Sequence, residues 1–493
     1  MRPALRIVRR GRVTSLEGFA PTETLLEHLR LREGATGTKE GCAEGDCGAC
    51  TVAVGRLRDG RVVYEPTNSC IQLLGSLDGA EVVTVDDLAS SATDLHPVQQ
   101  ALVDHHASQC GFCTPGFVMT LFALYHANEQ PDRAAVNEWL AGNLCRCTGY
   151  RPIADAALAS CGGAPRDEFT QNAGRTAEQL AALDDGQDLF VGNDETFFAA
   201  PASEDSLADL CARHPEAVIT GGATDVGLWI TKELRDLPRI IHTGRVSSLR
   251  AVSEERDRVE LGAAATYAEA ESALSGIDPD VGEVLQRLGS KQVRALGTVG
   301  GNIANGSPIG DMPPVLIALG ASIELRLGER RRTLPLEEFF LDYGLQDREP
   351  GEVLTRIRVP RLGRDERFRS YKISKRYDQD ISSVLGAFWF HTVGGRIVAA
   401  RMAWGGMAAT PRRSPRTEEV VIGLSLDDQG PSPDAEEALR AALARDFSPI
   451  DDHRASARYR QRVAGALVLK ALREIAGRPS GETRVRGHRQ DAA

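Results

Sequence analysis

Residues 41–50 read GCAEGDCGAC and hold three of the ten cysteines of this 493-residue chain. Cys42, Cys47 and Cys50 follow the spacing Cys-x4-Cys-x2-Cys, and Cys70 supplies a more distant fourth sulfur. This spacing is typical of a plant-type [2Fe-2S] site. The glycines between the cysteines let the backbone wrap tightly and point N–H groups at the sulfurs. We therefore predict that the first cysteine set (Cys42, Cys47, Cys50 and Cys70) holds a redox-active iron–sulfur cluster.

A second cysteine set (Cys110, Cys113, Cys145 and Cys147) lies in QCGFCTPG at residues 109–116 and NLCRCTGYRP at residues 143–152. Apolar spacing predicts helices over residues 96–108, from Pro115 onward, over 132–140 and from Pro152 onward. The cysteines then fall in breaks between helices, whose first turns offer free N–H groups. A Cys-x2-Cys pair alone could be a thiol redox pair. Together with the later Cys-x-Cys it predicts a second cluster.

Length, net charge and hydropathy restrict the class of protein and the kind of metal site that the chain can represent. The length suggests about three domains, and a net charge of −11 argues against nucleic acid as a partner. No segment approaches the ~20 apolar residues of a membrane span and no signal-peptide core follows Met1, so we expect a cytoplasmic protein without a membrane partner. Disulfides are rare in the cytosol, and zinc sites usually pair two Cys-x2-Cys or related motifs. Iron is therefore the better interpretation of both sets.

The remaining cysteines and the histidines give no metal pattern. Cys161 and Cys211 lie outside both sets, and the histidines show neither His-x2-His nor HExxH spacing. We expect all of them to be ordinary surface or core residues. Elsewhere, the pattern predicts a hairpin from residues 5–8 and 12–19 and a helix over 22–30. Residues 166–190 are polar and acidic, which favours a linker with at most a helical turn.

Two glycine-rich segments suit a phosphate-containing ligand. In VITGGATDVG, at residues 218–227, a short strand leads into a glycine turn whose N–H groups could hold a phosphate, although a plain loop is the alternative. The segment TVGGNIANGSPIGD, at residues 298–311, combines small residues with Asn, Ser and Thr, which allows close approach and directed hydrogen bonds. The chain has no GxGxxG dinucleotide motif.

These motifs resemble those of a known family. GCAEGDCGACTV, QCGFCTPGFVM and GNLCRCTGYRPI are similar to the two [2Fe-2S] signatures of the molybdenum hydroxylases, the xanthine dehydrogenase and aldehyde oxidase family. VITGGATDVG and TVGGNIANGSPIGD resemble the family's two FAD-contacting stretches, whose flavin fold is shared with vanillyl-alcohol oxidase. The resemblance therefore implies two [2Fe-2S] clusters and FAD.

The same resemblance implies a multidomain α+β fold with defined boundaries. The expected parts are a plant-ferredoxin-like β-grasp domain (1–92), a four-helix [2Fe-2S] domain (93–165), a linker (166–190), a vanillyl-alcohol-oxidase-type FAD-binding α+β domain (191–365), a flavoprotein C-terminal α+β domain (366–481) and a tail (482–493). In the C-terminal domain, residues 382–390 and 396–407 are expected to be strands and residues 435–447 a helix.

Site residues are carried over by matching positions. The resemblance implies FAD contacts from Ile219, Thr220, Gly221, Gly222, Ala223, Thr224, Asp225, Val226, Gly297, Thr298, Gly301, Asn302, Asn305, Asp311 and Lys372. Family members commonly have Asn at the position of Ala223 and Thr at that of Asn305, so the side-chain hydrogen bonds differ there. Tyr343 and Asp380 match positions on the NAD side, and Tyr343 could instead be a core aromatic residue.

The implied function is electron transfer within an oxidoreductase. The chain resembles the small subunit of a bacterial xanthine dehydrogenase, in which a molybdopterin-binding large subunit oxidises hypoxanthine and xanthine to urate in an α2β2 assembly. Electrons would pass through the two clusters to FAD and then to NAD+, and no substrate-converting catalytic residue is expected on this chain. The alternatives are the equivalent subunit for an aldehyde or N-heterocycle substrate, or a free-standing iron–sulfur flavoprotein.

Overall fold

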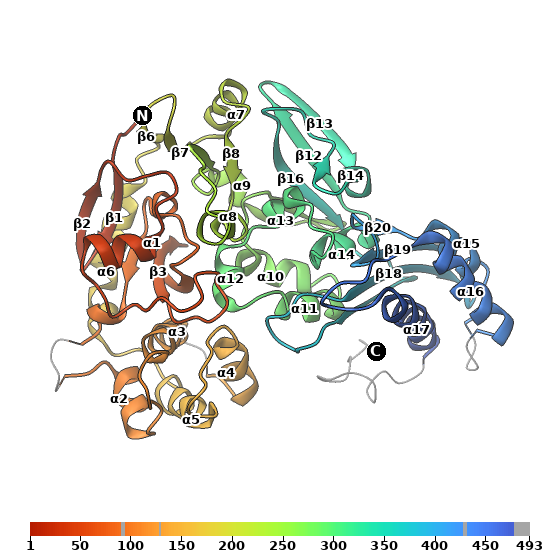
Figure 1. Cartoon of the computed structure of the whole chain (residues 1–493), viewed down its shortest axis with the longest axis horizontal. Coiled ribbons are helices and arrows are strands. Elements are labelled where there is room, and N and C mark those ends of the chain that lie inside the picture. The colour runs from red at the N-terminus through yellow and green to blue at the C-terminus, as the bar shows by residue number, and fades with distance from the viewer. Residues whose placement is uncertain (90–93, 128–129, 427–430, 478–493) are drawn as a thin grey trace. The chain divides into compact units, whose positions relative to one another are not determined.

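The computed structural model (Figure 1) describes residues 1–89, 94–127, 130–426 and 431–477. Contacts within it divide the chain into two compact units. Unit 1 comprises Met1–Arg250, Thr266–Ala268 and Gly289–Thr298. Unit 2 comprises Ala251–Ala265, Glu269–Leu288 and Val299–Ala493. The predicted tail at 482–493 lies outside the described residues. None of the helices in the described ranges is both long and apolar enough to cross a membrane.

Unit 1 begins with a five-stranded mixed sheet in the order β2-β1-β5-β3-β4. Its strands are β1 (Leu5–Arg9), β2 (Arg12–Leu16), β3 (Thr51–Arg58), β4 (Arg61–Asn68) and β5 (Glu81–Val83). The predicted hairpin is present, since β1 and β2 pair antiparallel. The helix predicted over 22–30 begins later, as α1 (Leu25–Glu27) followed by a π-helical turn (His28–Arg32). Thr24 sets this start, because its hydroxyl accepts the Glu27 N–H and its N–H donates to the Glu27 carboxylate.

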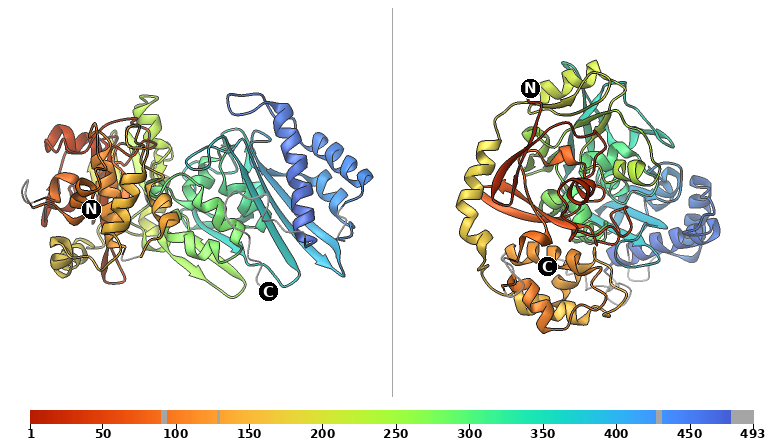
Figure 2. Two further views of the ribbon diagram at one scale, coloured as in Figure 1. Left: turned by 90° about the horizontal axis from the view of Figure 1, so that it is seen from below. Right: turned by 60° about the vertical axis from the view of Figure 1, so that its left-hand side comes forward.

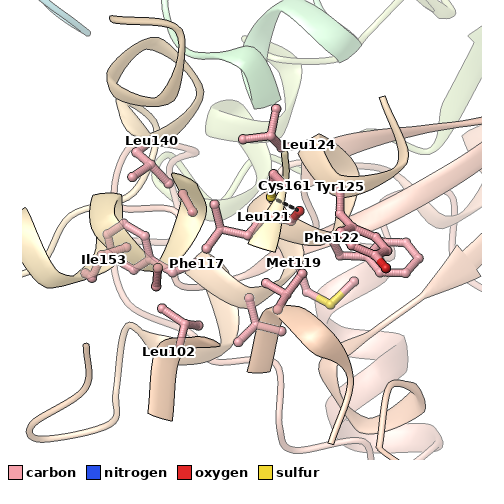
Figure 3. Packing of buried hydrophobic residues seen from close by; sticks show 14 of the residues in the cluster. Leu102, Phe117, Met119, Leu121, Phe122, Leu124, Tyr125, Leu140, Ile153 and Cys161 are labelled. Atoms are coloured by element: carbon pink, nitrogen blue, oxygen red, sulfur yellow. Dashed lines mark hydrogen bonds between the residues drawn. The ribbon is translucent and has the colours of Figure 1, made fainter. Parts of the chain in front are cut away.

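Four helices follow, as predicted: α2 (Pro97–Asp104), α3 (Thr114–His126), α4 (Arg133–Leu140) and α5 (Arg151–Ser160). Helix α3 is buried on nearly every side, and Phe117, Leu121 and Phe122 lie among Leu102 and Ile153 from its neighbours (Figure 3). Full burial of each such side chain contributes about 1.5–3 kcal/mol. Packing around α3 therefore fixes the positions of the cysteine-bearing loops at the helix ends.

The segment expected to be a linker contains a long helix instead. Helix α6 (Glu168–Leu183) begins at Asp167, whose Oδ1 accepts the Thr170 N–H at 2.7 Å. Only three of its residues are buried, and Leu180 and Leu183 pack against Val8 of β1. Because this apolar stripe is so narrow, the composition of the segment resembles that of a linker.

The rest of unit 1 is built on a second sheet in the order β6-β7-β9-β8. Its strands are β6 (Leu189–Gly192), β7 (Phe197–Ala200), β8 (Val218–Thr220) and β9 (Arg239–His242), with β7, β9 and β8 parallel. The accompanying helices are α7 (Glu204–Arg213), α8 (Val226–Thr231), α9 (Ser247–Arg250) and α12 (Lys291–Leu296). The carboxyl end of β8 leads directly into the glycine turn predicted to hold a phosphate.

Unit 2 contains two antiparallel sheets and a short hairpin. The first sheet has the order β10-β11-β16-β12-β13, with β10 (Val252–Glu254), β11 (Arg258–Gly262), β12 (Ser322–Leu327), β13 (Arg330–Pro335) and β16 (Val353–Pro360). The hairpin is β14 (Phe340–Asp342) with β15 (Leu345–Gln346). Helices α10 (Tyr267–Ser275), α11 (Pro279–Gln286), α13 (Val299–Asn305) and α14 (Met312–Leu319) complete this part, although Tyr267 and Ala268 of α10 group with unit 1.

The second sheet of unit 2 has the order β17-β18-β19-β20. It comprises β17 (Glu366–Ile373), β18 (Val384–Val393), β19 (Arg396–Gly405) and β20 (Arg412–Arg413), accompanied by α15 (Pro415–Val421), α16 (Pro433–Asp446) and α17 (Ala457–Ile475). Phe388 and Trp404 from the sheet share a core with Leu443 of α16 and Val468 of α17, and Figure 2 shows these blue helices alongside the sheet. The strands and helix expected in this domain are therefore present.

Candidate cofactor sites

The first cysteine set converges on one place. The Cys42 side chain interacts with those of Cys47 and Cys70, and the Cys70 side chain also interacts with that of Cys50. Cys50 and Cys70 are buried, whereas Cys42 and Cys47 are half-buried. The loop 41–50 supplies three of these sulfurs, and the residues just after β4 supply the fourth. Four sulfurs far apart in sequence thus form a single potential metal site.

Backbone N–H groups point at these sulfurs. The Cys47 N–H donates to Cys42 Sγ at 3.3 Å, and the backbone of Glu44 also approaches this sulfur. The loop reaches this shape through left-handed residues, including Ala43 at φ 54° and Gly48 at φ 69°. A Cβ at Gly48 would lie 2.1 Å from the carbonyl oxygen of Gly142, so this position requires glycine.

The thiols of the first cysteine set shift one another's pKa values. Neighbouring Cys42 and burial raise the pKa of Cys47, and Cys42 and Cys50 together with burial raise the pKa of Cys70. Hydrogen bonds from Cys47 and Cys70 lower the pKa of Cys42. Four thiolates at such separations repel one another unless positive charge lies between them. Iron supplies that charge, so the donor set fits a [2Fe-2S] cluster.

The second cysteine set is assembled at helix ends. Cys113 lies within hydrogen-bonding distance of Cys145, and Cys110 within that of Cys147. Cys113 directly precedes the first residue of α3, as the helix pattern predicts. Burial raises the pKa of Cys113 to about 12, with a further contribution from Cys145. Cys110 and Cys147 are exposed, so this set lies nearer the surface of unit 1 than the first.

The loops of the two cysteine sets are in direct contact. The Leu144 N–H donates to the carbonyl oxygen of Cys47 at 3.0 Å. Next to it, Asn143 Nδ2 donates to the carbonyl oxygen of Gly48 at 3.1 Å. Leu144 immediately precedes the ligand Cys145. A backbone hydrogen bond therefore joins the ligand Cys47 of the first set to the residue that precedes the ligand Cys145 of the second set.

The predicted FAD residues are divided between the two units. Residues 219–226, Gly297 and Thr298 belong to unit 1, and Gly301, Asn302, Asn305, Asp311 and Lys372 belong to unit 2. In unit 1 the loop 219–226 packs against the C-terminal end of α12, since a Cβ on Gly222 would lie 1.7 Å from the Leu296 oxygen. Ala223 has a φ of 58°, a conformation that Asn adopts more readily than Ala. This preference agrees with the family's common choice of Asn at that position.

Helix α8, which follows this loop, contacts the first cysteine set. Thr231 Oγ1 donates to the carbonyl oxygen of Ala43 at 2.7 Å, and Lys232 Nζ donates to that of Cys42. Leu228 packs against the small core that contains Cys50 and Cys70. The short helix α8 thus connects the loop 219–226 to the surroundings of the first cysteine set.

In unit 2 the structure brings Asp311 and Lys372 together. Lys372 Nζ lies 2.5 Å from Asp311 Oδ2 and donates to the Arg287 carbonyl oxygen at 3.0 Å. Ser382 Oγ donates to the other oxygen of Asp311 at 2.5 Å. All three polar side chains are buried. Neither Ser382 nor Arg287 was among the predicted site residues, because only the folded chain places them beside Asp311 and Lys372.

The two residues predicted on the NAD side lie at the surface of unit 2. Tyr343, in the turn between β14 and β15, is 73% exposed, which excludes the alternative of a core aromatic residue. Asp380 is half-exposed and accepts the Arg376 N–H at 2.7 Å. Their role toward NAD+ remains a prediction.

One cluster outside these sites has the composition of a metal site. His96 and His126 each place Nε2 2.8 Å from Asp167 Oδ2, and the group is largely buried. However, His96 Nδ1 accepts the Val98 N–H, so the His96 proton is on Nε2 and donates to Asp167. A metal on Nε2 would force a proton onto Nδ1, against that N–H. The cluster is therefore a structural hydrogen-bond network, as expected for the histidines.

Cys161 and Cys211 are buried thiols away from both sets. Cys161 Sγ donates to the Leu121 carbonyl oxygen at 3.7 Å within the helical core (Figure 3). Burial raises the pKa of Cys161 to about 11. Such a thiol is inert, as predicted.

Comparison with known proteins gives these sites a family. Residues 84–158 match a [2Fe-2S] binding domain, residues 194–362 the FAD binding domain in molybdopterin dehydrogenase, and residues 369–475 the CO dehydrogenase flavoprotein C-terminal domain. The chain carries the iron–sulfur and FAD domains of the molybdenum hydroxylase family. The predicted multidomain α+β fold class is therefore confirmed, as are [2Fe-2S] and FAD as its cofactors.

The relatives that match this chain carry the names of enzymes with different substrates. Xanthine dehydrogenase of Drosophila subobscura is 33% identical over 466 residues, which cover 83% of this chain and 35% of that protein. Aldehyde oxidase 1 of Bos taurus is 29% identical over 476 residues, covering 85% and 36%. The chain thus spans about a third of the length of these curated relatives.

Among solved structures, a carbon monoxide dehydrogenase from Hydrogenophaga pseudoflava that lacks the Mo-pyranopterin moiety of its molybdenum cofactor is similar, with a TM-score of 0.52 and 27% identity. The similarity covers 56% of this chain and 95% of the matched chain.

Proposed function

We propose that this chain is the electron-transfer part of a xanthine dehydrogenase. Electrons would come from a molybdenum centre on a partner chain and pass through the second cysteine set, the first cysteine set and FAD to NAD+. The observation that carries the proposal is the unbroken series of contacts in unit 1. Leu144 contacts Cys47, and Lys232, which directly follows α8, contacts Cys42, so the first cysteine set has contacts both with the loop of the second set and with the segment that follows the loop 219–226.

This order suits the chemistry of the cofactors. A [2Fe-2S] cluster carries one electron, whereas FAD accepts electrons singly and releases them as a hydride. The residues of this chain supply the surroundings. N–H groups directed at Cys42 stabilise negative charge on its sulfur. The buried Lys372 and Asp311 supply a fixed ion pair among the predicted FAD contacts of unit 2.

The second cysteine set offers a surface for receiving electrons. Cys110 and Cys147 are exposed, and three apolar side chains beside them are exposed as well: Phe112 (49%), Leu144 (42%) and Tyr150 (38%). The molybdenum-containing partner would cover this surface, and we propose an α2β2 assembly. Xanthine dehydrogenases are frequent among the similar relatives, which favours xanthine, but the partner's pocket determines the substrate. An aldehyde is therefore the second candidate.

Co-purification from the native source tests the proposal. We expect a stoichiometric molybdenum-containing chain, and xanthine should bleach the cluster and flavin absorbance of the complex, with NAD+ restoring it. Bleaching by an aldehyde but not by xanthine would transfer the assignment to the second candidate. Recovery of an iron–sulfur flavoprotein with no molybdenum-containing partner would overturn the proposal.

A further inference from the structure

A fully buried glutamine connects the surroundings of the two cysteine sets. Gln292, on α12, is 0% exposed. Its Nε2 donates to Thr120 Oγ1 at 3.1 Å and to Asn143 Oδ1 at 3.0 Å, and lies 3.4 Å from Thr51 Oγ1. These three residues come from α3, from the segment before Cys145 and from the residue after Cys50. One amide group thus meets structural parts that carry ligands of both sets.

The partners of Gln292 are also bonded to one another. Thr120 Oγ1 donates to Asn143 Oδ1 at 2.7 Å. Asn143 Nδ2 and Thr51 Oγ1 both donate to the carbonyl oxygen of Gly48, at 3.1 and 2.7 Å. Gly48 lies between the ligands Cys47 and Cys50. A buried network of this kind holds its members in one arrangement, because each displaced group would lose a partner out of reach of water.

Gln292 is less favourable for stability than an apolar residue of similar size would be. Its Oε1 is buried and has no hydrogen-bond partner among the described residues. A buried acceptor without a partner destabilises the fold, a penalty that a leucine of similar size would avoid. The space around it is tight, since a Cβ on Gly142 would lie 1.9 Å from this oxygen. The donor end of the amide must therefore provide something that packing does not.

Helix α12 also anchors the segment that follows it. Lys291 Nζ and Arg294 Nη2 lie 3.2 and 3.0 Å from Glu138 Oε1 on α4. At its other end, the Leu296 carbonyl oxygen packs on Gly222 of the loop 219–226. Helix α12 thus contacts the four-helix part, both cysteine loops and the loop 219–226, which is predicted to contact FAD.

We propose that Gln292 is a positioning residue that fixes the separation of the two [2Fe-2S] clusters. It acts through Thr120, Asn143 and Thr51, and touches neither cluster. Its expected consequence is a single, well-defined magnetic interaction between the two reduced clusters and a fixed pair of midpoint potentials. The inference rests on the cluster sites of the proposed function, but not on its partner, substrate or acceptor.

The test compares Gln292→Leu with Gln179→Leu in the full chain. Gln179 is half-buried on α6 and donates one hydrogen bond to the Gly11 carbonyl oxygen, away from the network, so it is a matched control. Electron paramagnetic resonance of the dithionite-reduced proteins gives the splitting between the clusters, and redox titration gives both potentials. We expect Gln292→Leu to keep its iron and flavin, to show a weaker and broader splitting, and to shift the potentials, while the control matches the wild type.

Wild-type splitting and potentials in an iron-loaded Gln292→Leu would overturn the inference, as would a wild-type protein without any splitting. Should Gln292→Leu fail to hold iron, Thr120→Val answers the same question, because at nearly constant shape it removes the hydroxyl that accepts from Gln292 and donates to Asn143. A smaller change in the same direction supports the proposal, and unchanged spectra and potentials refute it. Since the measurement needs neither a molybdenum partner nor NAD+, failure of the proposed function would not affect it.

Discussion

Each cysteine set has four cysteine ligands, but the two sets lie in different surroundings. The first is wrapped by a glycine-rich loop, and Cys50 and Cys70 are buried. The second lies at the ends of packed helices, and Cys110 and Cys147 are exposed. A buried cluster suits a station inside a relay, whereas an exposed one suits exchange with a partner. Burial of the ligands, more than their identity, therefore separates the expected roles.

The largest expected effect comes from removing a ligand from each set. Cys50→Ser and Cys147→Ser should each lose one cluster, so that iron falls from about four to about two per chain. Cys50→Ser should also lower the melting temperature more, because Cys50 packs in a core with Leu26 and Ile71. Iron analysis, paramagnetic resonance and thermal unfolding measure these outcomes. Loss of both cluster signals in either variant would mean that the sets are not separate sites.

A smaller effect should distinguish the two loops by their glycines. Gly48 and Gly149 both have φ near the left-handed value, at 69° and 67°. Gly149→Ala has open space and should cost only the conformational strain of about 1–2 kcal/mol. Gly48→Ala adds a clash with the Gly142 oxygen, so it should be more destabilising and should lose iron from the first set. Equal losses in denaturant titrations would show that the loop contact is not rigid.

The third effect concerns the network of His96, His126 and Asp167 in the helical part of unit 1. Burial would raise the pKa of Asp167, but hydrogen bonds from His126, His96 and the Thr170 N–H outweigh it, and the pKa is lowered. Because the folded pKa lies below the unfolded value of about 3.9, the stabilisation is full above that pH and is lost as pH falls through the folded pKa. Asp167→Asn should cost about 1.5–3 kcal/mol at neutral pH and flatten the acid limb of the stability curve.

The control for Asp167 is the helix cap Asp132. Asp132 Oδ1 accepts only the Ala135 N–H in an exposed position, so Asp132→Asn should change stability by a few tenths of a kcal/mol. Equal effects of the two substitutions in urea titrations at neutral and acid pH would contradict a special role for the histidine contacts.

What could be predicted from the sequence depended on how local the signal was. The cysteine spacings, the helix starts near Pro115 and Pro152 and the hairpin of β1 and β2 are local patterns, and the fold contains them. Helix α6 was not expected, because only three of its residues are buried and its sequence therefore shows little apolar periodicity. Contacts between distant segments were also beyond the sequence. The hydrogen bonds of Ser382 to Asp311 and of Gln292 to Asn143 join residues far apart in the chain, and no local spacing predicts such pairs.

Metal, acid-labile sulfide and flavin analysis of the purified chain tests the central claim most directly, together with paramagnetic resonance of the reduced protein. Two [2Fe-2S] clusters and a flavin predict about four iron, about four sulfide and about one FAD per chain, with two distinguishable cluster signals. Two zinc ions without labile sulfide, or iron without flavin, would contradict the account.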